Sequence, residues 1–397
     1  MVNVYCAAAV AGLLALVSLE SPAGAQAPEA SKLPPDLKIN QLQVLGTHNS
    51  YAAGVDPRLA ALFEAKVSGA FSSYVAHLPP AQQALFREEH PNELSPSEML
   101  KYAHPSLTDQ LDLGVRSLEI DVNPDPKGGV YADPVGYRLL RAQGAADLLP
   151  FDATGLDAPG FKVLHIPDID FRSNCPALRL CLRQLKAWSI AHPGHVPLFI
   201  LIEAKVQDVP ILPGATHTIP FSRAVFDDLD QEILEGVGRD RIITPDDVRG
   251  TYPTLNAAVR AKAWPTLSAA RGKMLFLLLT ANGPGGAADY VADHPSLKGR
   301  VAFLRSEPGE DHAAFLLMDN ALVRFDEIKK RVAEGYLVRT RSDIETYEAK
   351  VNDRRRADAA FASGAQIVST DFERPGNAYG TPYVIQLPGG EAARRVP

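Results

Sequence analysis

The sequence predicts an α/β protein built as a TIM-type (β/α)8 barrel, in a single domain with a helical insertion after the first strand. Short apolar runs of strand length alternate with helical segments along most of the chain, which favours a parallel sheet, and eight such runs favour closure into a barrel. The chain has 397 residues, of which 46% are hydrophobic and 22% are charged, as in ordinary folded domains. Barrels of this length are commonly one domain.

The first residues have the pattern of a secretory signal peptide, predicted over residues 1–25. An apolar stretch runs from about Ala7 to Leu19, and Ala23-Gly24-Ala25 forms a small-x-small cleavage site. The stretch is too short for a spanning helix, although no Lys or Arg precedes it. Residues 26–37 are predicted to be a Pro-rich linker and residues 38–397 the barrel domain. We therefore expect a secreted or periplasmic protein, cleaved near Ala25.

Cysteine usage agrees with export. Cys6 lies in the predicted signal peptide, which leaves Cys175 and Cys181 as a pair close in sequence. An even number of cysteines in an exported chain favours a disulfide, with two free thiols as the alternative.

Four apolar, strand-like runs carry residues suited to phosphate chemistry at or near their C-terminal ends. The runs are LGTHNSY (45–51), SLEIDV (117–122), VLHIP (163–167) and FILIEAK (199–205). They supply two histidines, His48 and His165, and four oxygen ligands, Asn49, Glu119, Asp121 and Glu203. In a parallel barrel the C-terminal ends of all strands meet at one face, so we expect these side chains to share one pocket.

The spacing of the acidic residues predicts a cation site. Glu119 and Asp121 are two residues apart, so both carboxylates point to the same face of the strand. Two like charges on a buried strand are costly unless a cation compensates them. Asn49, Glu119, Asp121 and Glu203 offer oxygen atoms, which calcium prefers. The histidines would then remain available for proton transfer.

Each of these signals has a simpler interpretation when taken alone. His165 fits a buried core histidine, and Glu203 with Lys205 fits a structural ion pair. Four such motifs in order, each ending an apolar run, favour catalysis instead. The other histidines, among them His90 and His104, have no comparable neighbours in the sequence.

The rest of the chain supplies further strands and helices. Helices are predicted at residues 61–78 and 97–114, both in the insertion, and at 176–192 and 222–238. Strands five to eight are predicted at 273–280, 312–319, 335–341 and 365–372, with residues 301–306 as a candidate extra strand.

The motifs together resemble the calcium-dependent phosphoinositide-specific phospholipases C. The resemblance covers best the catalytic half, about residues 40–205, and more loosely the bacterial secreted branch through LVRTRSD (337–343) and IVSTDFE (367–373). It implies a distorted TIM barrel that cleaves phosphatidylinositol to diacylglycerol through a cyclic inositol phosphate. It also implies calcium on Asn49, Glu119, Asp121 and Glu203, with His48 and His165 flanking the phosphate.

Further residues at predicted strand ends are candidate substrate contacts. Lys205, Arg339 and Arg341 lie at strand ends where an inositol phosphate would lie, and Asp371 ends the last predicted strand. No recognisable pleckstrin, EF-hand or C2 module and no lysine-rich stretch is present. We therefore expect plain phosphatidylinositol as the substrate, bound at a membrane surface by a monomer.

Two other classes of function stay open at this point. A glycerophosphodiester phosphodiesterase or phospholipase-D-like enzyme would use the same barrel, but it favours His-Arg-Gly where this chain has His48-Asn49-Ser50. A secreted barrel that binds a sugar or anion without catalysis is the third interpretation. The formal net charge of −7 argues against a nucleic-acid partner.

Overall fold

The computed structural model describes residues 33–92, 94–208 and 210–397, so the predicted signal peptide and most of the predicted linker lie outside the described residues. The strands are β1 (Leu42–Thr47), β2 (Ser117–Val122), β3 (Leu198–Ala204), β4 (Met274–Leu279), β5 (Phe303–Leu304), β6 (Phe315–Asn320), β7 (Leu337–Arg341), β8 (Ile367–Thr370) and β9 (Arg394–Arg395).

The helices of the described residues fall into three groups along the chain. Between β1 and β2 lie α1 (Pro57–His77), α2 (Pro80–Glu89), α3 (Pro96–Met99) and α4 (Leu107–Asp112). Between β2 and β4 lie α5 (Val135–Ala142), α6 (Leu178–Ala191), α7 (Arg223–Val237), α8 (Pro245–Arg249), α9 (Leu255–Arg260) and α10 (Leu267–Ala270). The last group is α11 (Ala287–Val291), α12 (Ala321–Ala333), α13 (Tyr347–Val351) and α14 (Arg355–Ala362). Single 3-10 turns lie at Ile39–Gln41, Arg239–Arg241 and Pro295–Leu297.

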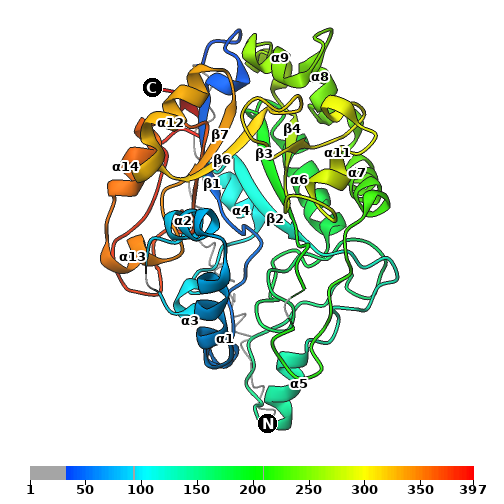
Figure 1. The fold of residues 1–397 in the computed structure, drawn as a ribbon, viewed down its shortest axis with the longest axis vertical. Coiled ribbons are helices and arrows are strands. Elements are labelled where there is room, and N and C mark those ends of the chain that lie inside the picture. The colour runs from blue at the N-terminus through cyan, green and yellow to red at the C-terminus, as the bar shows by residue number, and fades with distance from the viewer. Residues whose placement is uncertain (1–32, 93, 209) are drawn as a thin grey trace, which may run out of the picture.

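Strands β1 to β8 form the predicted parallel barrel (Figure 1). Their order is β5-β4-β3-β2-β1-β8-β7-β6, and neighbouring strands pair in parallel. A single parallel bridge between Arg305 and Phe315 joins β5 to β6 and nearly closes the ring. The predicted (β/α)8 fold class is therefore confirmed, and the two-residue β5 is where the barrel is distorted.

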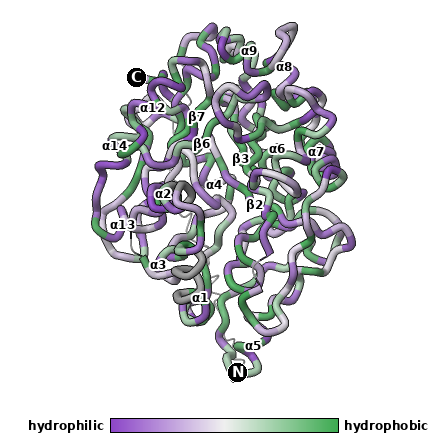
Figure 2. The backbone as a smooth tube through the Cα atoms, viewed as in Figure 1, coloured by the Kyte–Doolittle hydropathy of each residue, from purple (hydrophilic) through white to green (hydrophobic). Residues whose placement is uncertain are grey.

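The strands are predominantly buried because helices cover the outside of the barrel. Every residue of β1, β2, β4 and β7 is buried, and hydrophobic residues run through the centre of the fold (Figure 2). Gly46 shows how closely the strands approach inside. A Cβ atom at this position would lie 2.8 Å from Cβ of Ser117, so glycine allows β1 to sit against β2 just below the site.

Two predicted elements differ from the structure. The run at 163–167 is not a strand, because β2 and β3 pair directly along their whole length and leave no place between them. Residue Lys162 only bridges Asn123 and Ala177, and the chain then turns at His165. The strand that brings the barrel to eight is instead β5, which lies in the run at 301–306 that was predicted only as an extra strand.

The helical insertion is confirmed but is more divided than predicted. The segment 97–114 forms two short helices, α3 and α4, separated by residues around Pro105, and α2 was not predicted. Proline lacks an N–H and disfavours a helical residue before it, which explains the break. The insertion follows β1 and the long 123–177 segment follows β2, so both project from the same end of the barrel (Figure 1).

The pair Cys175–Cys181 forms the predicted disulfide, which joins the end of the 123–177 segment to α6. None of the helices in the described part of the chain has the length and apolar character needed to span a membrane.

Candidate active site

The register of the barrel places one set of side chains toward its interior. Asp121 pairs with Glu203, Glu203 with Leu279, and Leu317 with Arg339. Partners in register point to the same side of a sheet. Just beyond the C-terminal ends of the strands these side chains line a cavity of about 640 Å³, whose walls include His48, His165, Glu119 and Glu203. Most of the predicted site residues thus line one cavity, whereas Asn49, Asp121 and Asp371 are not among its lining residues.

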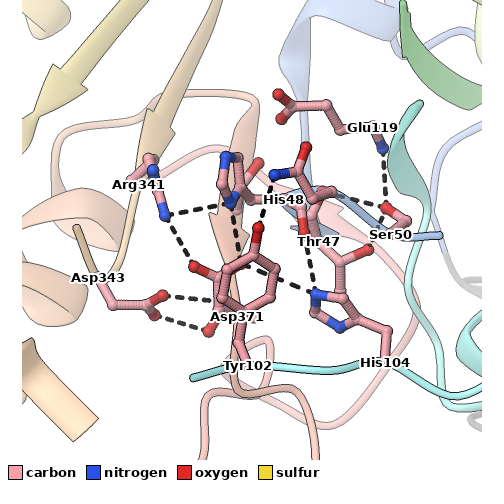
Figure 3. A network of polar contacts seen from close by, with 12 residues as sticks. Thr47, His48, Ser50, Tyr102, His104, Glu119, Arg341, Asp343 and Asp371 are labelled. Atoms are coloured by element: carbon pink, nitrogen blue, oxygen red, sulfur yellow. Dashed lines mark hydrogen bonds and ion pairs between the residues drawn. The ribbon is translucent and has the colours of Figure 1, made fainter. Parts of the chain in front are cut away.

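His48 lies directly after β1 and is fixed by a carboxylate from the neighbouring strand. Its Nδ1 lies 3.0 Å from Oδ1 of Asp371, which follows β8. The other oxygen of Asp371 accepts a hydrogen bond of 2.8 Å from Arg341 (Figure 3). Burial lowers the pKa of His48, and Arg341 lowers it further against the effect of Asp371. The ring is therefore neutral near pH 7, as a proton acceptor must be.

Asp371 itself stays ionised. Burial opposes the charge, but the hydrogen bond from His48 and the charge of Arg341 hold the pKa of this carboxyl far below its ordinary value. A charged carboxylate on Nδ1 fixes the tautomer with the proton on that nitrogen and leaves Nε2 as the acceptor. Among the described residues, Nε2 of His48 makes no hydrogen bond.

His165 repeats this arrangement from a loop. Its Nδ1 lies 2.9 Å from Oδ2 of Asp170, and its backbone N–H donates to the carbonyl of the same residue. About a quarter of the side chain is exposed, and the ring lines the same cavity as His48. His48 and His165 therefore both line this cavity, and the ring of each is oriented by its own carboxylate.

The predicted cation site is built from β2 and β3. Ligand atoms of Glu119, Asp121 and Glu203 all lie within 4.8 Å of one another. Burial is the main reason why the pKa of Asp121 rises to about 6 and that of Glu119 to about 7. Oδ2 of Asp121 lies 3.2 Å from Nζ of Lys205, and the two carboxylate oxygens otherwise lack a well-aligned hydrogen bond among the described residues. Buried oxygens with so few donors fit a hard divalent cation, and an all-oxygen set suits calcium.

Asn49, the fourth predicted ligand, is held by two tyrosines. Its amide donates to the hydroxyl of Tyr102 at 2.7 Å, and the hydroxyl of Tyr51 lies 3.5 Å from its Oδ1. Asn49 adopts a left-handed backbone conformation with φ of 46°, which asparagine tolerates better than most residues. The turn directs His48 and Asn49 to different parts of the site.

The three cations predicted to bind phosphate all have carboxylate partners. Lys205 lies 3.1 Å from Glu203 and 3.2 Å from Asp121. Arg339 donates to Glu119 at 2.9 Å and also to Asp319. Arg341 is paired with Asp371, as described above. Their role as substrate contacts, like that of Asp371, therefore stays a prediction.

Sequence reasoning missed three residues at this site. Arg305 lines the cavity after β5, and among the described residues its guanidinium makes no hydrogen bond or ion pair. His90, at the end of α2, reaches the cavity and lies 2.8 Å from Glu345. His104 is buried behind His48. The alternation of the apolar run at 301–306 could have predicted that Arg305 points into the barrel. No sequence pattern indicated that His90 and His104, which lie in the insertion, would reach the site.

Comparisons with known proteins bear on the family and the fold of the chain. A family model described as phosphoinositide phospholipase C, Ca2+-dependent, matches residues 61–397. No curated protein matches the chain. A calcium-dependent phosphoinositol-specific phospholipase C from Pseudomonas sp., solved as a myoinositol complex, is 16% identical with a TM-score of 0.52, and the match covers 95% of this chain and 99% of that one. A Ca2+-dependent phosphatidylinositol-specific phospholipase C from Streptomyces antibioticus is 17% identical with a TM-score of 0.51, over 84% and 95% of the two chains. At these identities the structural matches establish the fold alone.

Proposed function

Because the chain belongs to the calcium-dependent phosphoinositide phospholipase C family, we propose that it cleaves phosphatidylinositol to diacylglycerol and a cyclic inositol phosphate. The observation that carries this proposal is the pair of carboxylate-oriented histidines, His48 and His165, on one cavity with an acidic cluster. One imidazole for the attacking hydroxyl and one for the leaving oxygen are what a phosphodiester cleavage by internal attack requires.

In this proposal each histidine acts through Nε2. His48 takes the proton of the inositol 2-hydroxyl, since its pKa is lowered and Asp371 holds the Nδ1 proton. His165 donates a proton to the departing diacylglycerol oxygen, with Asp170 fixing its ring. Attack by a hydroxyl of the same molecule benefits from a large effective molarity, which explains why the cyclic phosphate forms before any linear product.

Glu119, Asp121 and Glu203, with Asn49 as a further oxygen ligand, would hold the calcium ion. Held there, calcium would lower the pKa of the attacking hydroxyl and offset charge on the phosphate. Lys205 lies between two of these carboxylates, so it neutralises part of their charge and limits the repulsion among them. Arg339 does the same for Glu119, whereas Arg341 pairs with Asp371 beside His48.

We further propose that the chain acts outside the cytoplasm, as a monomer, on phosphatidylinositol at a membrane surface. The Cys175–Cys181 disulfide supports an oxidising compartment. The predicted signal peptide, outside the described residues, supports the same conclusion.

The test is product analysis with phosphatidylinositol vesicles, followed by phosphorus NMR. We expect diacylglycerol and a five-membered cyclic phosphate as first products, and loss of turnover in EGTA. A substrate methylated at the 2-hydroxyl should resist cleavage. His192→Ala is the control for alanine variants of His48 and His165, because His192 packs on Trp188 of α6 away from the cavity.

Other products would contradict the proposal. A linear monoester as first product, or rapid cleavage of the methylated lipid, would make water the nucleophile, as in glycerophosphodiester phosphodiesterases. Phosphatidate would indicate D-type cleavage. Full turnover in EGTA would exclude a role for calcium.

A further inference from the structure

His104 belongs to the insertion, yet it lies under the catalytic turn. Its side chain is fully buried, and its backbone is tied on both sides. The His104 N–H donates to the carbonyl of Ala52 at 2.9 Å, and the side-chain amide of Asn174 donates to the His104 carbonyl at 2.9 Å. Asn174 directly precedes Cys175 of the disulfide. The imidazole is therefore held in place by both segments that project from the barrel.

The partners of the ring require a proton on each nitrogen. Nε2 lies 2.9 Å from the backbone carbonyl oxygen of His48, and Nδ1 lies 3.0 Å from Oε2 of Glu373 (Figure 3 shows the first contact). A carbonyl oxygen only accepts hydrogen bonds, and so does an ionised carboxylate. Both contacts are made together only by an imidazolium. Burial alone would lower the pKa of His104, but Glu373 and Asp371 outweigh it and raise the pKa to about 10.

The peptide that His104 holds is the one that orients both halves of the reaction centre. The His48 carbonyl belongs to the peptide group between His48 and Asn49, where β1 ends and the backbone turns into the left-handed region. Rotation of this group would move the catalytic imidazole and the predicted calcium ligand at the same time. At the end of β1 a buried carbonyl needs a donor, and His104 supplies a charged one.

The same imidazolium also acts on Asp371. Nε2 of His104 lies 3.7 Å from Oδ1 of Asp371, the oxygen that holds Nδ1 of His48. Arg341 pairs with the other oxygen. Two cations thus flank the carboxylate that fixes the tautomer of His48, one from β7 and one from the insertion.

We propose that His104 is a positioning residue, a buried imidazolium that clamps the His48–Asn49 peptide and keeps Asp371 ionised beside His48. Its effect on turnover rests on the proposed function, whereas its effects on calcium affinity and on its own protonation do not. The insertion then completes the reaction centre.

The first test compares two substitutions of buried histidines. His104→Phe keeps a ring of similar size but removes both donors. His195→Phe is the matched control, since His195 is also buried and bonds Ser189 and its own neighbour Val196, outside the cavity. Misplacement of a reacting group by about 1 Å costs on the order of 100-fold. We expect His104→Phe to lower kcat about 10- to 100-fold with KM changed less than about threefold, and to weaken calcium binding about tenfold by calorimetry.

A conservative variant separates positioning from general destabilisation. His104→Gln retains one donor for the His48 carbonyl, so it should recover part of kcat relative to His104→Phe. His195→Phe should lose thermal stability while its kcat and calcium affinity stay at the wild-type level. Equal losses of kcat in the His104 and His195 variants would overturn the proposal, and so would wild-type kcat in His104→Phe.

The second test needs no variant and no turnover. Nitrogen-15 NMR of the histidine rings in the wild-type chain should find both nitrogens of His104 protonated at about pH 8, where an unperturbed histidine is neutral. A neutral His104 ring would overturn the proposal even if the Phe variant fails to fold. If the wild-type chain cleaves no phosphatidylinositol, the proposed function fails, and the NMR and calcium measurements still decide on His104.

Discussion

Replacing Asp121 by asparagine should make the calcium-free protein more stable while it damages the calcium site. Asp121 is fully buried, and apart from the ion pair with Lys205 its carboxylate oxygens lack a well-aligned hydrogen bond among the described residues. Burial is the main cause that raises its pKa from 3.8 to about 6. At about pH 8 this difference corresponds to about 3 kcal/mol of lost folding stability. Asparagine has the same shape and no charge to desolvate.

The dependence on pH follows from the direction of this change. Because the folded-state pKa is raised, the folded protein holds the proton more tightly than the unfolded chain does. Stability therefore falls as the pH rises from 3.8 to about 6 and stays low above that range. The advantage of Asp121→Asn should be absent at about pH 4 and complete at about pH 8. The raised pKa already includes the attraction of Lys205. The cost of burying the asparagine amide without a hydrogen-bond partner reduces the gain to about 1–2 kcal/mol.

Urea unfolding in EGTA and in calcium measures both effects. In EGTA at about pH 8 the variant should unfold at higher urea than the wild type. In calcium the order should reverse, because saturating calcium stabilises the wild type by about 3 kcal/mol at a hundredfold excess and the variant has lost a charged ligand. Asp125→Asn is the control, since Asp125 accepts backbone hydrogen bonds from Gly128 and Val130 and its loss should destabilise under all conditions. An Asp121→Asn protein that is less stable in EGTA at about pH 8 would refute the reasoning.

Three further predictions concern turnover. His48→Ala and His165→Ala should each lower kcat about 100- to 10,000-fold with calcium affinity nearly unchanged; near wild-type turnover of His165→Ala would leave His165 without a catalytic role. Asp170→Asn should lower kcat less than His165→Ala does, because it only frees the ring, and a steady-state comparison of the two variants checks this order. Arg305→Met should raise KM for phosphatidylinositol about tenfold while the melting temperature stays the same, because the guanidinium has no protein partner among the described residues; an unchanged KM would exclude Arg305 as a substrate contact.

The parts of the site that the sequence predicted correctly depend on local geometry. Glu119 and Asp121 share a face because strand side chains alternate, and Glu203 joins them because β2 and β3 pair in register. Both conclusions need only the strand period and a parallel sheet. The prediction of the disulfide also depended only on local sequence, since the two cysteines are six positions apart.

The errors in the strand assignment have a physical cause as well. The run at 163–167 has the apolar character of a strand, but a strand also needs an unpaired neighbour, and β2 and β3 already pair with each other. The strand that the prediction lacked is β5, which has only two residues, Phe303 and Leu304. Its pattern is too short to distinguish it from a loop. His165 still reaches the cavity because its backbone and ring are both bonded to Asp170.

Long-range partners decided the remaining roles. His104 binds a backbone carbonyl, which has no sequence signature, and Glu373, which lies 269 positions away. Lys205 directly follows β3 as predicted, whereas Arg339 lies in the middle of β7, and both have carboxylate partners on other strands. Many carboxylates surround the C-terminal ends of these strands. A Lys or Arg side chain there forms an ion pair with a nearby carboxylate, so its position alone does not make it a phosphate ligand. We therefore predict that the substrate phosphate meets Arg305, which directly follows β5, lines the cavity and makes no ion pair among the described residues, across the ring of strands from His48 at the end of β1.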